Sequence, residues 1–333
     1  MGARVLRIQL PTPFTVGPVN AYLLPGSPPT LVDCGPCTGE AWEALAAGLA
    51  RHGVPVDRIG HLVLTHPHHD HAGLARRVRE ASGCRVLAHP VDHDRLLGRP
   101  GAWEAVADFL VEVCRRAGVP GPLREAVRRS LDGLQRYAEP LDAVEPLSEG
   151  DRLPGDEGGW RVLHTPGHAR GALCLWNPER AVLVSGDTLI PHISSNAILE
   201  PATGAFRERT LPQYLHTLER LSGLGVREVF PGHGPPMGPP EGLIRDRLAF
   251  HEERCRDVLA LVQAGRHRPW DIAQDLFPDL DPGYVFLAVS EVVGHLDLLA
   301  ERGLVRFEGQ GGDWRAEPVP TRDAPRSTFS CPP

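Results

Sequence analysis

The sequence predicts an α/β protein in which short buried strands end in turns that carry ligand-type side chains. Residues 61–64 form a short apolar run typical of a buried strand, and residues 73–78 have the pattern of a helix that follows it. Later apolar runs at residues 161–164, 181–185 and 229–230 end in glycine-containing turns. Open α/β sheets bind ligands at the carboxyl ends of their strands, so a functional site is expected at these turns.

The length of the chain indicates more than one domain. Its 333 residues exceed the size at which a single core usually stops growing. A proline-rich stretch at residues 235–240 separates the strand-and-helix pattern from a helical one. We therefore expect a larger domain over residues 1–240 and a smaller domain over residues 241–317. Residues 318–333 are rich in Pro, Ser and Thr, and a mobile tail is expected there.

A helical insertion is expected within the first domain, at about residues 93–146. Its apolar residues recur at helical spacing on both sides of a break near residues 119–122. The first apolar stripe consists of Trp103, Val106, Phe109, Leu110 and Val113. Such a helical pair either walls a substrate pocket or packs against the domain without a functional role.

Helices followed by two strands make the C-terminal domain resemble a winged helix. A long helix is predicted from Glu241, a shorter one at residues 269–277 and a third at residues 285–299. Residues 303–307 and 313–316 then have the pattern of a β-hairpin.

The third predicted helix of this domain is apolar and acidic. It carries Glu291 and Asp297 where a DNA-binding helix carries arginines. We therefore expect the domain to form a homodimer or to close the substrate pocket.

A cluster of His and Asp residues directly follows the strand at residues 61–64. His66 and His68 are two residues apart, so their imidazole rings can reach the same metal ion. Asp70 and His71 follow immediately and can turn towards a neighbouring ion. Imidazoles and carboxylates without a thiolate suit borderline-hard divalent cations that generate hydroxide from water.

Three downstream turns repeat one design. Each apolar strand ends in glycine plus a ligand-type side chain, at His168, Asp187 and His233. Glycine lets the backbone turn sharply and aims the next side chain into the crevice at the strand ends. A surface loop with unrelated histidines would explain the first cluster alone, but not the ordered set of turns.

The ordered motifs His-x-His-x-Asp-His, Thr-Pro-Gly-His, Gly-Asp-Thr and Pro-Gly-His-Gly resemble those of the metallo-β-lactamase-fold hydrolases. The resemblance covers about residues 5–240 and implies a four-layer αβ/βα sandwich. It also implies two divalent metal ions, with zinc preferred over iron or manganese. By this resemblance, one ion is held by His66, His68 and His168. The second is held by Asp70, His71 and His233, with Asp187 as the bridge.

The resemblance also assigns supporting residues. Asp33 matches a position from which the family supports its metal loops. Apart from the resemblance, Asp70 is expected to orient the nucleophile in a hydrolytic reaction. His192 follows the bridging aspartate in the sequence, so it is a candidate to stabilise the oxyanion, and the alternative is a packed or surface histidine.

Within this family, the chain is similar to the branch of β-lactamase-like protein 2 and the glyoxalase II-like enzymes. Flavin-linked diiron members have a glutamate at the position of His68, and the best-known β-lactamases have a cysteine near that of Asp187. Hydrolysis is therefore favoured over redox chemistry, and β-lactams are not the expected substrates. The leading hypothesis is attack by a metal-bridging hydroxide on a small thioester, ester or lactone.

The alternative hypothesis is a metal-dependent endoribonuclease that acts on single-stranded RNA, as some members of the branch do. The chain lacks the longer insertion domain of the RNA-processing members, which favours a small substrate. Its net charge of −7 also argues against binding nucleic acid through bulk electrostatics.

The composition is that of an ordinary globular protein. Hydrophobic residues make up 41% and charged residues 23%, and no segment approaches the apolar length that spans a bilayer. The N-terminus has no signal-peptide pattern, and the seven scattered cysteines do not form a disulfide framework. We expect a cytoplasmic protein with a small-molecule substrate and no membrane partner.

Overall fold

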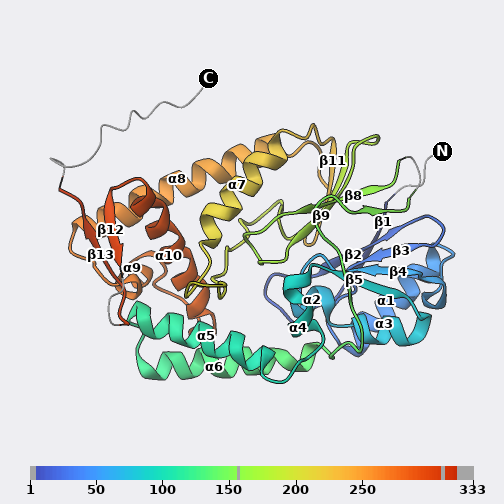
Figure 1. The fold of residues 1–333 in the computed structure, drawn as a ribbon, viewed down its shortest axis with the longest axis horizontal. Helices are drawn as coiled ribbons and strands as arrows, with labels where there is room; N and C mark the ends of the chain where they lie inside the picture. Colours follow the sequence, from blue (N-terminus) through green and yellow to red (C-terminus); the bar gives the residue numbers. More distant parts are fainter. Residues whose placement is uncertain (1–4, 156–157, 309–311, 321–333) are drawn as a thin grey trace.

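The computed structural model describes residues 5–155, 158–308 and 312–320, whose strands form two large sheets and one hairpin (Figure 1). The first sheet follows chain order from β1 to β6, with the bounds Leu6–Leu10, Val19–Leu24, Thr30–Val32, His61–Val63, Arg85–Ala88 and Glu145–Pro146. Strands β1 to β3 pair antiparallel, and β3 to β6 pair parallel. The parallel strands therefore end at one edge of the sheet.

The second sheet has the strand order β11, β10, β9, β8, β7. In chain order from β7, the bounds are Arg152–Leu153, Trp160–His164, Leu173–Asn177, Val182–Gly186 and Glu228–Pro231. All neighbours are antiparallel except β10 and β11. Because these two strands run in the same direction, the turns that follow them meet at one edge, where Gly232 N donates to Gly186 O at 2.7 Å.

The two sheets face each other across an apolar core. Successive side chains of a strand point to opposite faces, and β2 follows this rule. Its Tyr22 and Leu24 enter the core between the sheets, whereas Leu23 packs on the outer face. The second sheet contributes Val162 and Val184 to the same inner core.

Helices cover the outer faces of both sheets. α1 (Gly39–Arg51) and α3 (Ala75–Ser82) pack on the first sheet, with Leu45 in the core between them. α7 (Thr210–Ser222) packs on the second sheet, and its Leu218 is fully buried. The layers therefore run helix, sheet, sheet, helix, and the predicted four-layer αβ/βα sandwich is confirmed.

The expected helical insertion is present as α4 (His93–Leu96), α5 (Ala102–Ala117) and α6 (Gly121–Leu134). α5 ends at Gly118, whose φ of +94° is the left-handed conformation that glycine adopts readily at a helix end. In Figure 1 the pair α5 and α6 runs from below the C-terminal elements towards α4. The shorter helices are α2 (His69–Ala72) and the 3-10 turns Val56–Arg58, Pro90–Asp92, Gln135–Tyr137 and Pro282–Tyr284.

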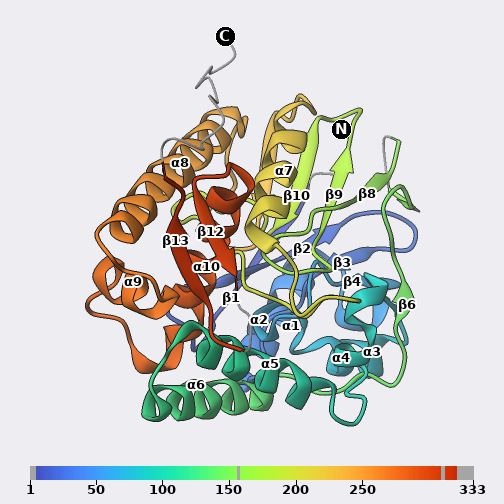
Figure 2. The same cartoon turned by 60° about the vertical axis from the view of Figure 1, so that its left-hand side comes forward.

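The predicted C-terminal helices and hairpin are also present. The helices are α8 (Glu241–Gln263), α9 (Pro269–Leu276) and α10 (Val285–Glu301). The hairpin pairs β12 (Val305–Glu308) antiparallel with β13 (Arg315–Pro318). Figure 2 shows this hairpin beside α10, on the same side of the molecule as α7 and α8.

The C-terminal elements share one apolar core with the insertion and the second sheet. This core joins Leu110 of α5, Leu218 of α7 and Val292 of α10. Pro318, which was expected to begin the tail, instead ends β13, and residues 321–333 of that predicted tail lie outside the described residues.

The expectation that no segment reaches membrane-spanning length is wrong for α10. The helical segment Pro282–Glu301 is long and apolar enough, with a mean hydropathy of 1.4 over its 18-residue window. However, 72% of that window is buried inside the protein. A helix that is apolar on all sides is also typical of a protein core, and its packing explains the composition of α10.

The contact between α10 and α7 generates a stability prediction. A Cβ on Gly294 would lie 2.7 Å from the Cβ of Leu211. That atom is bonded directly to the backbone of α7, so it cannot move aside as the end of a flexible side chain can. Gly294→Ala should therefore lower the free energy of unfolding by about 1–2 kcal/mol despite the better helix propensity of alanine. Urea unfolding monitored by circular dichroism measures this difference.

The matched control is Gly133 in α6, where an added Cβ meets nothing within 4 Å. Gly133→Ala should raise stability by about 0.5 kcal/mol. A Gly294→Ala protein as stable as the wild type would contradict the close packing of α10 on α7.

Candidate metal centre

The seven predicted ligand residues all lie where strands end. His66 and His68 follow β4, and Asp70 and His71 lie in the one-turn helix α2. The remaining three, His168, Asp187 and His233, follow β8, β10 and β11 respectively. Both sheets therefore deliver side chains to one crevice, as the sequence predicted.

The first group consists of His66, His68 and His168. One potential ligand atom from each lies within 4.8 Å of the others. His168 Nε2 is 3.0 Å from His68 Nδ1, and the rings of His66 and His68 meet edge to face at 4.6 Å. Three imidazoles at these separations can hold one cation.

The second group consists of Asp70, His71 and His233. Its candidate ligand atoms also lie within 4.8 Å of one another. His233 Nε2 is 3.2 Å from Asp70 Oδ2, and His71 Nε2 is 3.9 Å from the same oxygen.

Asp187 lies between the two groups. Its Oδ1 is 3.3 Å from His71 Nε2, and its Oδ2 is 3.6 Å from His233 Nε2. The same Oδ2 is 3.8 Å from His168 Nε2. The carboxylate thus faces both groups, which is the arrangement needed to bridge two ions.

Unpartnered polar atoms point into this centre. Four buried atoms have no hydrogen-bond partner among the described residues: His66 Nε2, His71 Nε2, His233 Nε2 and Asp187 Oδ1. Buried polar atoms without partners are costly, and metal coordination would satisfy all four. The residues present therefore fit divalent metal ions.

The opposite nitrogens of these rings are held in place. His71 Nδ1 is 2.8 Å from Asp33 Oδ2, and His233 Nδ1 donates to Pro18 O at 3.0 Å. Such a contact orients the ring so that Nε2 faces the metal. His68 differs, since its Nδ1 is the atom that faces the centre.

Asp33 supports the metal loop as the sequence predicted. Its carboxylate accepts from Thr65 N at 2.8 Å and from Thr65 Oγ1 at 2.7 Å, besides contacting His71. Asp33 itself has a φ of +58°, an uncommon conformation for a residue with a Cβ. These contacts hold that strained backbone and connect β3 to the metal loop.

Glycine is required beside the bridging carboxylate. A Cβ on Gly232 would lie 2.1 Å from Asp187 Oδ1 and 2.7 Å from His71 Cε1. The turn is further held from the first sheet, where Asn20 Nδ2 donates to Pro231 O at 2.8 Å. The buried Asn20 was missed from the sequence, although a lone Asn within an apolar strand was a signal for it.

The support for His168 was also missed. Its Nδ1 donates to Asn196 O at 3.0 Å, and Ser195 Oγ lies 2.9 Å from the same nitrogen. Asn196 Nδ2 in turn donates to Leu287 O of α10 at 3.1 Å. The C-terminal region therefore positions a candidate ligand through the segment that follows Asp187.

The histidines of the centre differ in their pKa shifts. Burial lowers the pKa of His66 and His68 well below the usual range, and neighbouring imidazoles lower it further. Burial raises the pKa of Asp187, but the adjacent His71 outweighs this and brings it to about 2. Before any cation binds, His66 and His68 are thus neutral and Asp187 is ionised. Burial lowers the pKa of His71 and His233, but the carboxylates of Asp187 and Asp70 outweigh this and raise it, so these two rings must release a proton when a cation binds.

A cavity of about 330 Å³ opens onto this centre. The side towards the centre is formed by His68, Asp70, His168 and Asp187. The insertion and α10 supply apolar walls that include Val106, Leu110, Leu131, Leu134, Phe286 and Leu287. Both regions therefore line this pocket, and the homodimer expected of the C-terminal domain stays a prediction.

His192 is not among the described residues that line this cavity. Its side chain is exposed, and its ring lies beside Gly234. The oxyanion role of His192 therefore stays a prediction that its placement does not favour.

A further cluster, which consists of His251, Glu291 and His295, lies between α8 and α10. His295 Nδ1 donates to Glu291 O at 2.7 Å, so its Nε2 accepts from His251 Nδ1 at 3.2 Å. His251 Nε2 then faces Ser194 Oγ at 3.3 Å. Each ring nitrogen has a partner, so this cluster is a hydrogen-bonded chain, unlike the metal centre.

A family model described as the metallo-beta-lactamase superfamily matches residues 14–233. The chain belongs to this superfamily. The probable metallo-hydrolase YqjP of Bacillus subtilis is 34% identical over 305 residues, covering 91% of this chain and 94% of the relative. A beta-lactamase-like protein 2 homolog of Caenorhabditis elegans is 24% identical over 298 residues, covering 89% and 83%.

A solved structure and a more distant relative extend this comparison. A metallo-beta-lactamase family protein of Thermus thermophilus matches with a TM-score of 0.77 at 29% identity, covering 95% of this chain and 98% of that one. An atrochrysone carboxyl ACP thioesterase of Aspergillus fumigatus is 24% identical over 246 residues, covering 73% of this chain and 59% of the relative. The expected membership of the superfamily is confirmed, and the chain is a metal-dependent hydrolase. Its relatives include β-lactamase-like protein 2 homologs, as the sequence motifs led us to expect.

The contacts of Asp33 generate a prediction about metal affinity. Asp33→Asn keeps the side-chain shape but removes the charge and one acceptor that hold Thr65 and His71. The affinity for Zn²⁺ should fall about tenfold to a hundredfold, the usual cost of losing such a supporting contact. Competition with a chromophoric chelator measures the affinity.

Asp57→Asn is the matched control, because Asp57 is exposed in the 3-10 turn Val56–Arg58 and is not one of the candidate ligands. This variant should bind Zn²⁺ as the wild type does. Equal affinities of the Asp33→Asn and wild-type proteins would show that the metal loop does not need this support.

Proposed function

We propose that this protein hydrolyses a small thioester, ester or lactone at a centre of two divalent metal ions. The observation that carries the proposal is the Asp187 carboxylate, which faces His71 on one side and His168 on the other. One ion is assigned to His66, His68 and His168. The other is assigned to Asp70, His71 and His233, with Asp187 shared.

The ligand chemistry supports this assignment. Nitrogen and oxygen donors suit zinc, and they suit iron or manganese as well. Ions bound here supply a Lewis acid for the substrate carbonyl and hydroxide formed from water near neutral pH. Asp70 lines the cavity, and its Oδ2 lies 3.2 Å from His233 Nε2. The carboxylate that we expect to orient that nucleophile therefore borders both the pocket and the second group of ligands.

The cavity supports an acyl substrate rather than a polymer. Its walls carry Val106, Leu110 and Phe286, which match a carbon chain. Its volume of about 330 Å³ is that of a small-molecule pocket. The thioesterase among the relatives acts on the same class of bond, which adds support for a thioester.

Turnover tests the proposal. Protein loaded with Zn²⁺, Mn²⁺ or Fe²⁺ is assayed against an acyl-thioester series, a lactone series and unstructured RNA. We expect acyl hydrolysis that a chelator abolishes and added metal restores. RNA cleavage without any acyl hydrolysis would replace this proposal with the endoribonuclease alternative.

The role of His192 has its own test. If its imidazole stabilises the oxyanion, His192→Ala should lower kcat by about one to three orders of magnitude while metal content stays normal. His216→Ala is the matched control, since His216 is exposed on α7. Unchanged kinetics of His192→Ala would remove His192 from the reaction, in agreement with its position outside the cavity wall.

A further inference from the structure

The insertion places an arginine without an acidic partner beside the metal loop. Arg95 lies in α4 and is partly buried, and its Nε is fully buried with no hydrogen-bond partner in the described chain. No ion pair within 4.0 Å joins it to a carboxylate of the described residues. A desolvated guanidinium without an anion is costly, because its lost hydration is not replaced.

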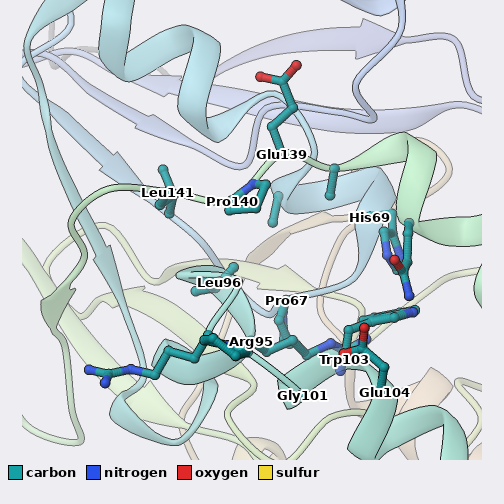
Figure 3. Close-up of a pocket in the computed structure, with 16 residues that line it drawn as sticks. Pro67, His69, Arg95, Leu96, Gly101, Trp103, Glu104, Glu139, Pro140 and Leu141 are labelled. Carbon is teal, nitrogen blue, oxygen red and sulfur yellow. The ribbon is translucent and has the colours of Figure 1, made fainter.

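Trp103 contributes a second unpartnered donor at the same place. Its ring centroid is 4.8 Å from the guanidinium carbon of Arg95, and its buried Nε1 has no hydrogen-bond partner among the described residues. His69 packs edge to face on the same ring, with centroids 4.6 Å apart. Figure 3 shows His69 and Trp103 close together at one end of a cavity.

These three side chains form the wall between two cavities. The cavity in Figure 3 has a volume of about 290 Å³ and is also lined by Leu96 and Pro140. His69, Arg95 and Trp103 line both this cavity and the one that reaches the metal centre. A group bound at Arg95 is therefore accessible from the side where the reaction takes place.

The nearby carboxylates compete weakly for Arg95. Glu200 and Asp92 are close enough to raise the pKa of Arg95 electrostatically, but neither forms an ion pair with it. Burial raises the pKa of both carboxyl groups, to about 7 for Asp92. Each is therefore less completely ionised at neutral pH than an exposed carboxyl group, which leaves the guanidinium available.

We infer that Arg95 and Trp103 bind an acidic group, a carboxylate or a phosphate, at one end of the acyl substrate. This inference rests on the proposed function. An oxyanion can accept two N–H groups of the guanidinium fork and a third from the indole. The apolar walls at Val106, Leu110 and Leu131 then hold the carbon chain between the acidic end and the metal centre.

The substrate class is therefore an ester, thioester or lactone that carries both an apolar chain and an anionic group. Binding the anion at a fixed point would place the acyl carbon at the metal centre, so the benefit appears in kcat/KM.

The test compares two esters that differ in one charge. These are the mono-4-nitrophenyl ester of adipic acid and the 4-nitrophenyl ester of adipamic acid, which is neutral. The variants are Arg95→Met, which keeps the length without the charge, and Arg95→Lys, which keeps the charge without the fork. A third ester that ends in a phosphate distinguishes the two anions. Metal content is measured for every protein.

The kcat/KM of the wild type should be at least about tenfold higher for the anionic ester than for the neutral one. Arg95→Met should lower the kcat/KM for the anionic ester by about tenfold to a hundredfold. The neutral ester should change by less than about twofold, and Arg95→Lys should retain part of the preference. The matched control is Arg99→Met, because Arg99 is exposed and paired with Asp94 at 2.7 Å. Its kinetics should equal those of the wild type.

Three results would overturn the inference. These are no charge preference in the wild type, equal losses on both esters in Arg95→Met, or an effect of Arg95→Met on RNA cleavage alone.

If metal-loaded protein cleaves no acyl substrate, the proposed function fails separately. The anion site is then judged by the indole N–H resonance of Trp103 during titration with adipate. A shift in the wild type that Arg95→Met abolishes supports the site, and no shift refutes it.

Discussion

The carboxylate of Asp187 is surrounded by imidazoles that arrive from three other loops. His71, His168 and His233 each place Nε2 within 4.0 Å of one of its oxygens. This convergence depends on the parallel pairing of β10 with β11 and on the contact between the edges of the two sheets. Because Gly232 has no side chain, the Asp187 carboxylate can lie against its backbone. The turn after β11 therefore fixes the position of a side chain that belongs to the turn after β10.

Around this centre, polar contacts with neighbouring residues orient the imidazole rings of the candidate ligands. Asp33 holds His71, the carbonyl of Pro18 holds His233, and the carbonyl of Asn196 holds His168. Each contact occupies the nitrogen that faces away from the centre. The Nε2 atoms of His71 and His233 are buried without a hydrogen-bond partner among the described residues, a configuration that a bound cation stabilises and that an apolar core would not tolerate.

The regions outside the sandwich belong to the same site. The insertion and α10 pack in one apolar core with α7, and both supply walls of the cavity that opens onto the metal centre. Asn196 connects the two, because its carbonyl orients His168 while its amide donates to Leu287 of α10. A change in the packing of α10 can therefore reach a candidate metal ligand through two hydrogen bonds.

The sequence by itself determined the layered α/β architecture, the helical pair and the seven residues of the candidate metal centre. These features are recorded locally, in the period of apolar residues and in glycine turns with a ligand-type side chain. Membership of the family also identified Asp33 as a support, which the structure places against His71 and Thr65.

Tertiary structure alone decided the contacts between residues that no local pattern connects. Asn20 of the first sheet reaches the turn at Pro231 that follows the second sheet. The Nε of Arg95 has no hydrogen-bond partner among the described residues, and its guanidinium lies against Trp103, which also contacts His69 of the metal loop. His192 is close to Asp187 in the sequence, yet its side chain is exposed. The physical reason is that chain proximity restricts where a backbone can go, whereas packing of distant elements decides which way a side chain points and what it meets there.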